Sequence, residues 1–415
     1  MSTTFVDLGV PAELADRLAR RGIANPFAIQ SATIPDALAG RDVCGKAPTG
    51  SGKTIAFGIP IALRVGKARS RRPRALVLTP TRELAAQVTR ELSALVGRDR
   101  SVVAVYGGAG YEPQRRALRN AVDVLVACPG RLEDLIQHGD VLLDEVEIVV
   151  VDEADRMADM GFLPAVKRLL DAVRPDRQTL LFSATLDGEI DVLVKRYQKN
   201  PRRHELEDPE HESGDVTHLF WKAERDQRVS LTAKLVNQQW PAIVFTRTKH
   251  GADRLARQLA QAGVSATAIH GNRSQGQRER ALADFSNGRV QALVATDVAA
   301  RGIHVDAVGC VVHFDPPADE KDYVHRSGRT GRAGLDGLVV SMVGNDVAQA
   351  VRKMQRALGL PQQLSAPDFE RAPAQQNRPT PRPTVHPEPS RPRTKGHTPA
   401  NRGRPTNRKR RPVRR

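Results

Sequence analysis

The segment Ala47-Pro48-Thr49-Gly50-Ser51-Gly52-Lys53-Thr54 decides the fold of this chain. It follows a short apolar run at 42–46 and precedes a helix-compatible segment at 55–63, so the order is strand, glycine loop, helix. Glycines allow a tight turn with inward-facing N–H groups, and the positive end of the next helix attracts phosphate. Ala47 stands where the strict pattern has glycine. The segment predicts a nucleotide-phosphate site in which Lys53 reaches the outer phosphates, Thr54 binds Mg²⁺, and the loop is formed by Thr49, Gly50, Ser51 and Gly52.

Length and charge limit the classes of protein that need considering. With 415 residues the chain has room for two ordinary domains and a tail. The net charge of +17 favours a polyanionic partner, most simply nucleic acid, without separating RNA from DNA or from an anionic membrane. Residues 371–415 hold 14 Lys and Arg and one Glu, which leaves only +4 for the rest of the chain.

The cysteines and the apolar runs of the chain bear on where in the cell the protein resides. Cys44, Cys128 and Cys310 lie far apart without a Cys-x-x-Cys pair, so neither a disulfide framework nor a zinc site is indicated. No apolar run approaches the ~20 residues of a membrane span, and the first residues lack an export signal. We expect a cytoplasmic protein with no membrane partner.

Alternating helical and β-branched segments predict an α/β fold with parallel sheets covered by helices on both faces. The expected strands lie at 42–46, 74–79, 102–106, 122–127, 146–151 and 179–183, and then at 242–246, 266–269, 292–296, 310–314 and 338–342. We expect a first domain at 1–204, an acidic linker at 205–215 and a second domain at 216–366. The remainder, 367–415, is rich in Pro and Arg and cannot form a core.

The acidic partner of the phosphate loop follows an apolar run at Asp152-Glu153-Ala154-Asp155. A parallel strand delivers Asp152 to the carboxyl edge of the sheet, where such folds bind ligands. Asp152 would then hold Mg²⁺, and Glu153 would orient and deprotonate the attacking water. By itself, such a cluster is more often a solvated end of a strand. The phosphate loop in the same domain favours the metal site.

This tetrapeptide resembles the motif for which the DEAD-box RNA helicases are named, and their other motifs occur here in the same order. The resemblance runs from Phe5 to about Gly334 and implies two tandem RecA-like domains that bind ATP, Mg²⁺ and RNA. Phe5 and Gln30 resemble the adenine-binding motif, since an amide can both donate to and accept from adenine. Phe27 stands where the family usually has Thr.

Further residues are assigned by the same resemblance. Ser183 and Thr185 would link hydrolysis to strand separation, together with His325. Without their neighbours these segments would be ordinary turns, caps and solvated loops. The implied RNA contacts are Arg82, Gly108 and Arg131 in the first domain and Thr246, Arg247, Gln275, Arg278 and Thr296 in the second, and the implied arginine fingers are Arg329 and Arg332.

The resemblance implies RNA-dependent ATP hydrolysis that destabilises short duplexes, with sequence-independent contacts to the RNA backbone. Ribosomal precursor and messenger RNA complexes are both compatible partners. Two alternatives stay open. One is an ATP-gated RNA clamp or annealing chaperone that acts through the basic tail, and the other is a DNA-directed repair ATPase.

Overall fold

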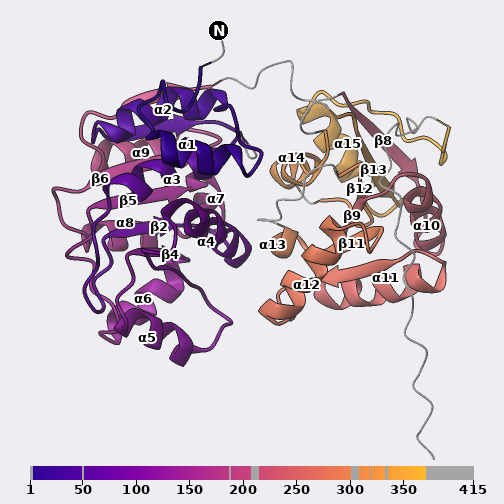
Figure 1. Cartoon of the computed structure of the whole chain (residues 1–415). Helices are drawn as coiled ribbons and strands as arrows, with labels where there is room; N and C mark the ends of the chain where they lie inside the picture. Colours follow the sequence, from indigo (N-terminus) through magenta and orange to yellow (C-terminus); the bar gives the residue numbers. More distant parts are fainter. Residues whose placement is uncertain are drawn as a thin grey trace, which may run out of the picture. The chain divides into compact units, whose positions relative to one another are not determined.

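The computed structural model describes residues 3–48, 51–186, 188–206, 215–300, 308–317, 319–331 and 335–370 (Figure 1). Its strands form two sheets in which all neighbouring strands are parallel. The expected α/β class with two tandem sheets is therefore confirmed. No helix in the described part of the chain is long and apolar enough to cross a membrane.

The first sheet has seven strands in the order β3-β4-β2-β5-β6-β1-β7. Their bounds are β1 Val43–Lys46, β2 Ala75–Leu78, β3 Val102–Val105, β4 Val124–Ala127, β5 Ile148–Asp152, β6 Gln178–Ser183 and β7 Arg202–Glu205. The accompanying helices are α1 Ala12–Ala19, α2 Ala28–Leu38, α3 Lys53–Arg64, α4 Arg82–Val96, α5 Tyr111–Arg119, α6 Pro129–Gln137, α7 Ala154–Asp159, α8 Leu163–Asp171 and α9 Glu189–Tyr197.

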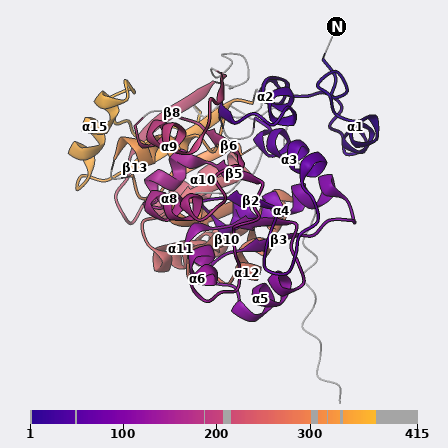
Figure 2. The same ribbon diagram turned by 90° about the vertical axis from the view of Figure 1, so that its left-hand side faces the viewer.

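Both faces of this sheet are buried. Alternate residues of β5 point to opposite sides, so that Val150 packs with residues of α3 and α4 while Val149 packs with residues of α6, α8 and α9. Figure 2 shows these helices on either side of β2 and β5. Burial on both faces explains why the strands are continuous apolar runs instead of alternating ones.

The second sheet has six strands in the order β10-β11-β9-β12-β13-β8. They are β8 Val216–Lys222, β9 Ala242–Phe245, β10 Ala266–Ile269, β11 Ala292–Ala295, β12 Cys310–His313 and β13 Gly337–Val343. The helices are α10 Arg228–Gln238, α11 Lys249–Gln261, α12 Gln275–Ser286, α13 Asp297–Ala300, α14 Glu320–Ser327 and α15 Ala348–Ala357. Both tryptophans of the chain, Trp221 and Trp240, are buried in one core cluster of this domain.

Two strands were not expected from the sequence. β7 reads Arg-Arg-His-Glu and pairs only with β1, so its backbone bonds and not its side chains place it in the sheet. β8 pairs with β13 over seven residues and lies at the edge of its sheet. Its side chains are only partly buried over the first four positions, which weakens the apolar signal.

The segment after α15 returns to the edge of the second sheet. Ser365 forms a parallel bridge with Trp221, in which its N–H donates to Phe220 O at 3.0 Å. Phe369 packs on Trp221 with ring centroids 5.0 Å apart, and Lys234 Nζ lies 4.1 Å from the centroid of Phe369. The described chain therefore packs on this domain beyond residue 366, where we expected it to end.

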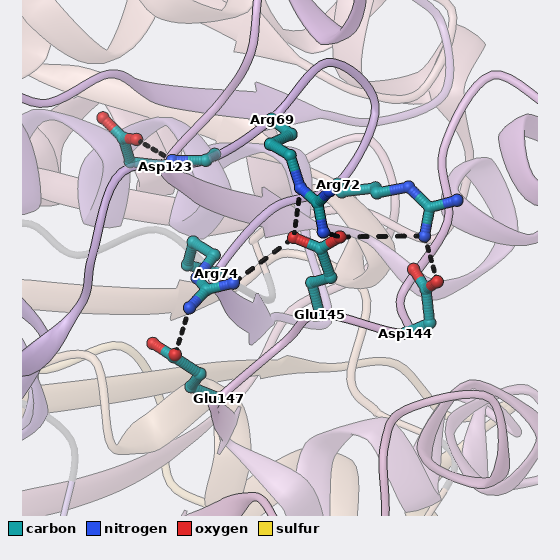
Figure 3. A network of polar contacts seen from close by, with 8 residues as sticks. Arg69, Arg72, Arg74, Asp123, Asp144, Glu145 and Glu147 are labelled. Atoms are coloured by element: carbon teal, nitrogen blue, oxygen red, sulfur yellow. Dashed lines mark hydrogen bonds and ion pairs between the residues drawn. The ribbon is translucent and has the colours of Figure 1, made fainter.

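A basic loop at the amino edge of the first sheet is neutralised by acidic partners (Figure 3). Glu145 accepts from Arg69 Nε at 3.2 Å and from Arg74 Nη1 at 3.3 Å. Arg72 is paired with Asp144 and Arg74 with Glu147. These contacts attach the loop between α3 and β2 to the segment before β5, on the edge opposite the phosphate loop.

Candidate active site

The phosphate loop lies between the carboxyl end of β1 and the start of α3. Gly52 caps α3 in the left-handed region at φ +85°, which favours glycine. Lys53 is buried and donates from Nζ to Ala47 O at 2.8 Å, across the mouth of the loop. Ser51 Oγ donates to Pro48 O at 2.8 Å. Thr49 and Gly50 lie outside the described residues.

The carboxylates come from β5, two strands away from β1 in the sheet order. Asp152 is 3% exposed, and burial raises its pKa to about 7. Glu153 follows in the left-handed region at φ +51°, an uncommon conformation for a non-glycine residue. Its Oε2 lies 3.0 Å from Arg156 Nη1. Such backbone positions are held by their surroundings and gather at functional sites.

The strand between them, β6, ends at Ser183, one of the expected coupling residues, and Thr185 follows two residues later. Ser183 Oγ accepts from Asp155 N at 3.1 Å, and Asp155 Oδ2 accepts from Ala184 N at 3.2 Å. Ser183 O also accepts from Ala47 N at 3.0 Å. Ser183 therefore touches both the phosphate loop and the acidic segment, whereas Thr185 is exposed.

Gln30 lies against the phosphate loop at the start of α2. It is fully buried, donates from Nε2 to Gly52 O at 3.0 Å, and accepts from Phe27 N at 2.9 Å. A Cβ at Gly52 would overlap this amide. Phe5 is 2% exposed and packs in the core, so any effect it has on the nucleotide acts through packing. Phe27 is exposed at 59% beside Gln30.

One pocket of about 110 Å³ brings residues of both domains together. The first domain contributes Lys53 and Glu153, and the second contributes His325 and Arg329. Arg326, also at this pocket, donates from Nη2 to Asp297 Oδ2 at 2.8 Å. Arg332 lies outside the described residues. The remaining lining residues are Asp155, Arg156, Asp159, Ala184, Phe245, Ala300 and Asp322.

The expected RNA contacts of the first domain are adjacent. Arg82 begins α4, and its guanidinium lies against Gly108, where a Cβ would overlap it. Gly108 has φ +80°. Arg131 of α6 donates from Nη1 to Ala109 O at 3.1 Å, next to Gly108. The structure thus brings three residues, separated by up to 49 positions in the chain, to one surface.

In the second domain the expected contacts lie after the carboxyl ends of β9 and β11 and in the first turn of α12. Thr246 and Thr296 are buried directly after these strands, and Arg247 is exposed. Gln275 Nε2 donates to Glu279 Oε1 at 3.1 Å. Arg278 donates from Nε to Glu83 Oε1 at 2.7 Å, and both side chains are buried. We had expected the guanidinium of Arg278 to contact RNA, but its Nε already donates to Glu83.

Sequence reasoning missed several partners at these sites. Arg156 pairs with Glu153 at a helical spacing of three, which the sequence displays but which is common on any helix. Asp159 pairs with Lys321, and Glu83 with Arg278. These last pairs join segments that are more than 160 residues apart, so no local pattern could reveal them.

The fold and the pocket define a protein with two RecA-like domains and a nucleotide site. A family model described as DEAD/DEAH box helicase matches residues 27–193, and another described as Helicase conserved C-terminal domain matches residues 227–334. The DEAD-box ATP-dependent RNA helicase CshA of Geobacillus kaustophilus is 41% identical over 344 residues, which cover 82% of this chain and 73% of that protein. The chain belongs to the DEAD-box RNA helicase family.

Some relatives are longer than this chain, which spans about 60% of their length. It is 42% identical over 365 residues to the mitochondrial DEAD-box ATP-dependent RNA helicase 9 of Arabidopsis thaliana, covering 86% of this chain but 60% of that protein. It covers 61% of the Arabidopsis helicase 30. The solved structure of Saccharomyces cerevisiae Dbp5 bound to RNA and ADP BeF3 has a TM-score of 0.74 at 27% identity, covering 88% of this chain and 95% of that one.

Proposed function

We propose that this chain is an RNA-dependent ATPase that uses ATP and Mg²⁺ to separate or remodel short RNA duplexes. The observation that carries the proposal is the pocket shared by Lys53, Glu153 and Arg329. A phosphate-binding lysine, a carboxylate and a guanidinium from a second domain are the groups that phosphoryl transfer to water requires. The solved Dbp5 relative, which holds RNA and ADP BeF3, supports both ligands.

The chain's own residues suit magnesium. Asp152 is a buried carboxylate whose pKa is raised to about 7 by burial, so a cation beside it would offset the cost of its ionised form. The described residues contain no cluster of three or more His, Cys, Asp or Glu that could hold a metal ion. Mg²⁺ typically takes one or two carboxylates and completes its shell with water and phosphate oxygens. Asp152 and the Thr54 hydroxyl would hold it, and bound Mg²⁺ would neutralise charge on the phosphates.

The steps at the active site follow from these positions. Lys53 exchanges its bond to Ala47 O for the outer phosphates, and Gln30 exchanges its bond to Gly52 O for the adenine edge. Glu153 orients the attacking water and takes its proton. Arg329 stabilises the charge that develops on the transferred phosphoryl group, as Arg332 would by resemblance.

RNA is the proposed partner, held along its backbone by both domains. In the first domain Arg82, Gly108 and Arg131 form one surface, and backbone amides near a glycine can approach phosphates closely. Contacts to phosphates and 2'-hydroxyls are independent of sequence. We propose a cytoplasmic setting because the chain has three free thiols and no disulfide among its described residues.

Comparing ATP hydrolysis with RNA and with DNA of the same sequence tests the substrate class. We expect RNA to stimulate turnover and DNA to have little effect, whereas equal stimulation would indicate a nucleic-acid ATPase of another kind. Arg329→Ala should reduce turnover by a factor of about 10³ while ATP binding persists. A loss of ATP affinity with normal turnover would contradict the role given to Arg329.

The charge of residues 371–415 supports a second candidate, an ATP-gated RNA clamp or annealing chaperone. A pure annealer speeds the pairing of complementary strands without ATP, whereas a helicase releases strands only with ATP. Duplex-release and annealing assays on the full chain and on residues 1–370 separate the two functions.

A further inference from the structure

Tyr111, which sequence analysis did not single out, lies over one of the expected RNA contacts. It is the first residue of α5, and Arg131 Cζ lies 3.9 Å from the centroid of its ring. Its hydroxyl donates to Asp134 Oδ2 at 2.8 Å. Arg131 and Asp134 both belong to α6, so a single tyrosine contacts this helix at two points one turn apart.

Two contacts hold the Arg131 guanidinium, whereas its Nε has no hydrogen-bond partner among the described residues. Its Nη1 donates to Ala109 O at 3.1 Å, while the ring of Tyr111 covers one face of the guanidinium. Arg131 is 9% exposed, and its Nε is buried without a hydrogen-bond partner among the described residues. A buried N–H without a partner is costly, and a small movement of the side chain towards a phosphate oxygen or 2'-hydroxyl of bound RNA would relieve this cost.

We propose that Tyr111 is a positioning residue for RNA binding, which fixes the plane of the Arg131 guanidinium so that this side chain meets the RNA backbone. The inference rests on the RNA-dependent function proposed above. Stacking on an aromatic ring suits a flat guanidinium in particular and restricts its rotation without using its N–H groups. The ring therefore orders Arg131 while leaving donors available to RNA.

Tyr197 offers a matched control in the same domain. The Cζ of Arg196 lies 5.0 Å from the centroid of its ring, and its hydroxyl donates to Asp171 Oδ1 at 2.9 Å. It thus makes the same two kinds of contact, to Arg196 of α9 and Asp171 of α8, and neither it nor these partners line the active-site pocket or the surface formed by Arg82, Gly108 and Arg131. A general effect of removing a tyrosine stacked on arginine would appear at both positions.

The test is a double-mutant cycle on RNA-stimulated ATP hydrolysis by the full chain, using Tyr111→Leu, Arg131→Ala and the pair. Tyr111→Leu should raise the half-saturating concentration of single-stranded RNA by about 3- to 30-fold, the range of a cation–π contact, with turnover at saturating RNA unchanged. In the Arg131→Ala background it should have no further effect, because it acts through that side chain. Tyr111→Phe, which keeps the ring, should stay close to wild type, as should Tyr197→Leu.

Two outcomes would overturn the inference. Wild-type RNA affinity in Tyr111→Leu would show that Arg131 needs no support, and an equal loss in the Arg131→Ala background would show that Tyr111 acts independently of it. If Tyr111→Leu does not fold, Tyr111→Gln tests the same point with a side chain that suits an exposed position. If the wild type itself shows no stimulation by RNA, the proposed function fails and not this inference alone.

Discussion

Glu153 is held at the pocket by an uncommon backbone conformation and by Arg156. We expect Glu153→Gln to abolish turnover while ATP and RNA stay bound, because the amide retains the shape and loses the base. Lys53→Ala should instead lose ATP affinity, because it removes a contact to the phosphates. Hydrolysis and nucleotide binding measured on both variants check this. Glu145→Gln, at the opposite edge of the sheet, is the control, and normal hydrolysis in Glu153→Gln would exclude the role of Glu153.

Burial of the Asp152 carboxylate lowers the stability of the metal-free fold. Burial raises its pKa to about 7, so its ionised form destabilises the metal-free fold, with the full cost present above pH 7 and less of it at pH 5. Asp152→Asn should therefore raise the melting temperature at pH 8 by at least about 2–4 °C and by less at pH 5. The amide can still accept from Glu153 N, as Asp152 Oδ1 does at 3.0 Å.

Asp42 provides the comparison for this variant, because it is also a buried carboxylate whose pKa is raised by burial. Its two oxygens accept from Thr179 N at 2.7 Å and Lys199 N at 2.6 Å. Asp42→Asn replaces one acceptor by a donor and should lower the melting temperature. Thermal unfolding in the presence of a chelator measures both, and a lower melting temperature for Asp152→Asn would contradict the prediction.

At the level of elements, α14 carries His325 and leads into Arg329, and one of its faces belongs to a buried polar cluster. Tyr323 is a buried residue of this helix, and His218 Nδ1 is 2.8 Å from its hydroxyl. His313 is fully buried with Nδ1 3.0 Å from Ser341 Oγ, and burial together with Arg326 holds its pKa well below the usual value. The pKa of His218 is lowered as well by burial.

These histidines make the second domain sensitive to acid. Because the pKa of each is lowered, both bind protons less readily in the folded chain than in the unfolded chain, where protonation occurs below about pH 6.5, so stability falls as the pH falls through that value. Each contributes up to about 1.4 kcal/mol per pH unit. His313→Asn should flatten this dependence between pH 7 and pH 5, measured by denaturant unfolding. His250→Asn, an exposed change on α11, should not, and an unchanged slope in His313→Asn would refute the prediction.

The sequence predicts elements better than it predicts contacts. Apolar runs such as 148–151 mark strands because they are buried on both faces, and motif spacing places Lys53 and Glu153 at one edge of a sheet. β7 could not be predicted, because its residues have no apolar pattern and its place depends on pairing with β1. Arg278 shows the same limit for the site, since its partner Glu83 is 195 residues away.

For the whole molecule, most of the net charge lies in residues 371–415, which carry +13 of the chain's +17. Deleting them should weaken RNA binding and flatten its salt dependence, by about 0.7 in the log–log slope for each charge that neutralises a phosphate. Turnover at saturating RNA should not change. Titrations of RNA at several salt concentrations check this, and an unaltered slope would assign the segment another role.

The control for this deletion is the position of the cut. A chain that ends at Glu370 keeps Phe369 on Trp221, whereas a chain that ends at residue 366 removes this contact and uncovers the indole. If only the chain that ends at residue 366 loses RNA binding, the loss is therefore due to disruption of the second domain. Equal melting temperatures for residues 1–370 and for the full chain establish that only charge was removed.

The fluorescence of the two tryptophans reports on the second domain alone. Trp221 and Trp240 are the only tryptophans in the chain, and both are buried in the second domain. Their fluorescence on heating or acidification follows the unfolding of that domain, while circular dichroism follows both. The effect of His313→Asn should appear in both signals, and that of Asp152→Asn in circular dichroism alone unless the domains unfold together. The same pair of signals therefore measures whether ATP and RNA couple the unfolding of the two domains.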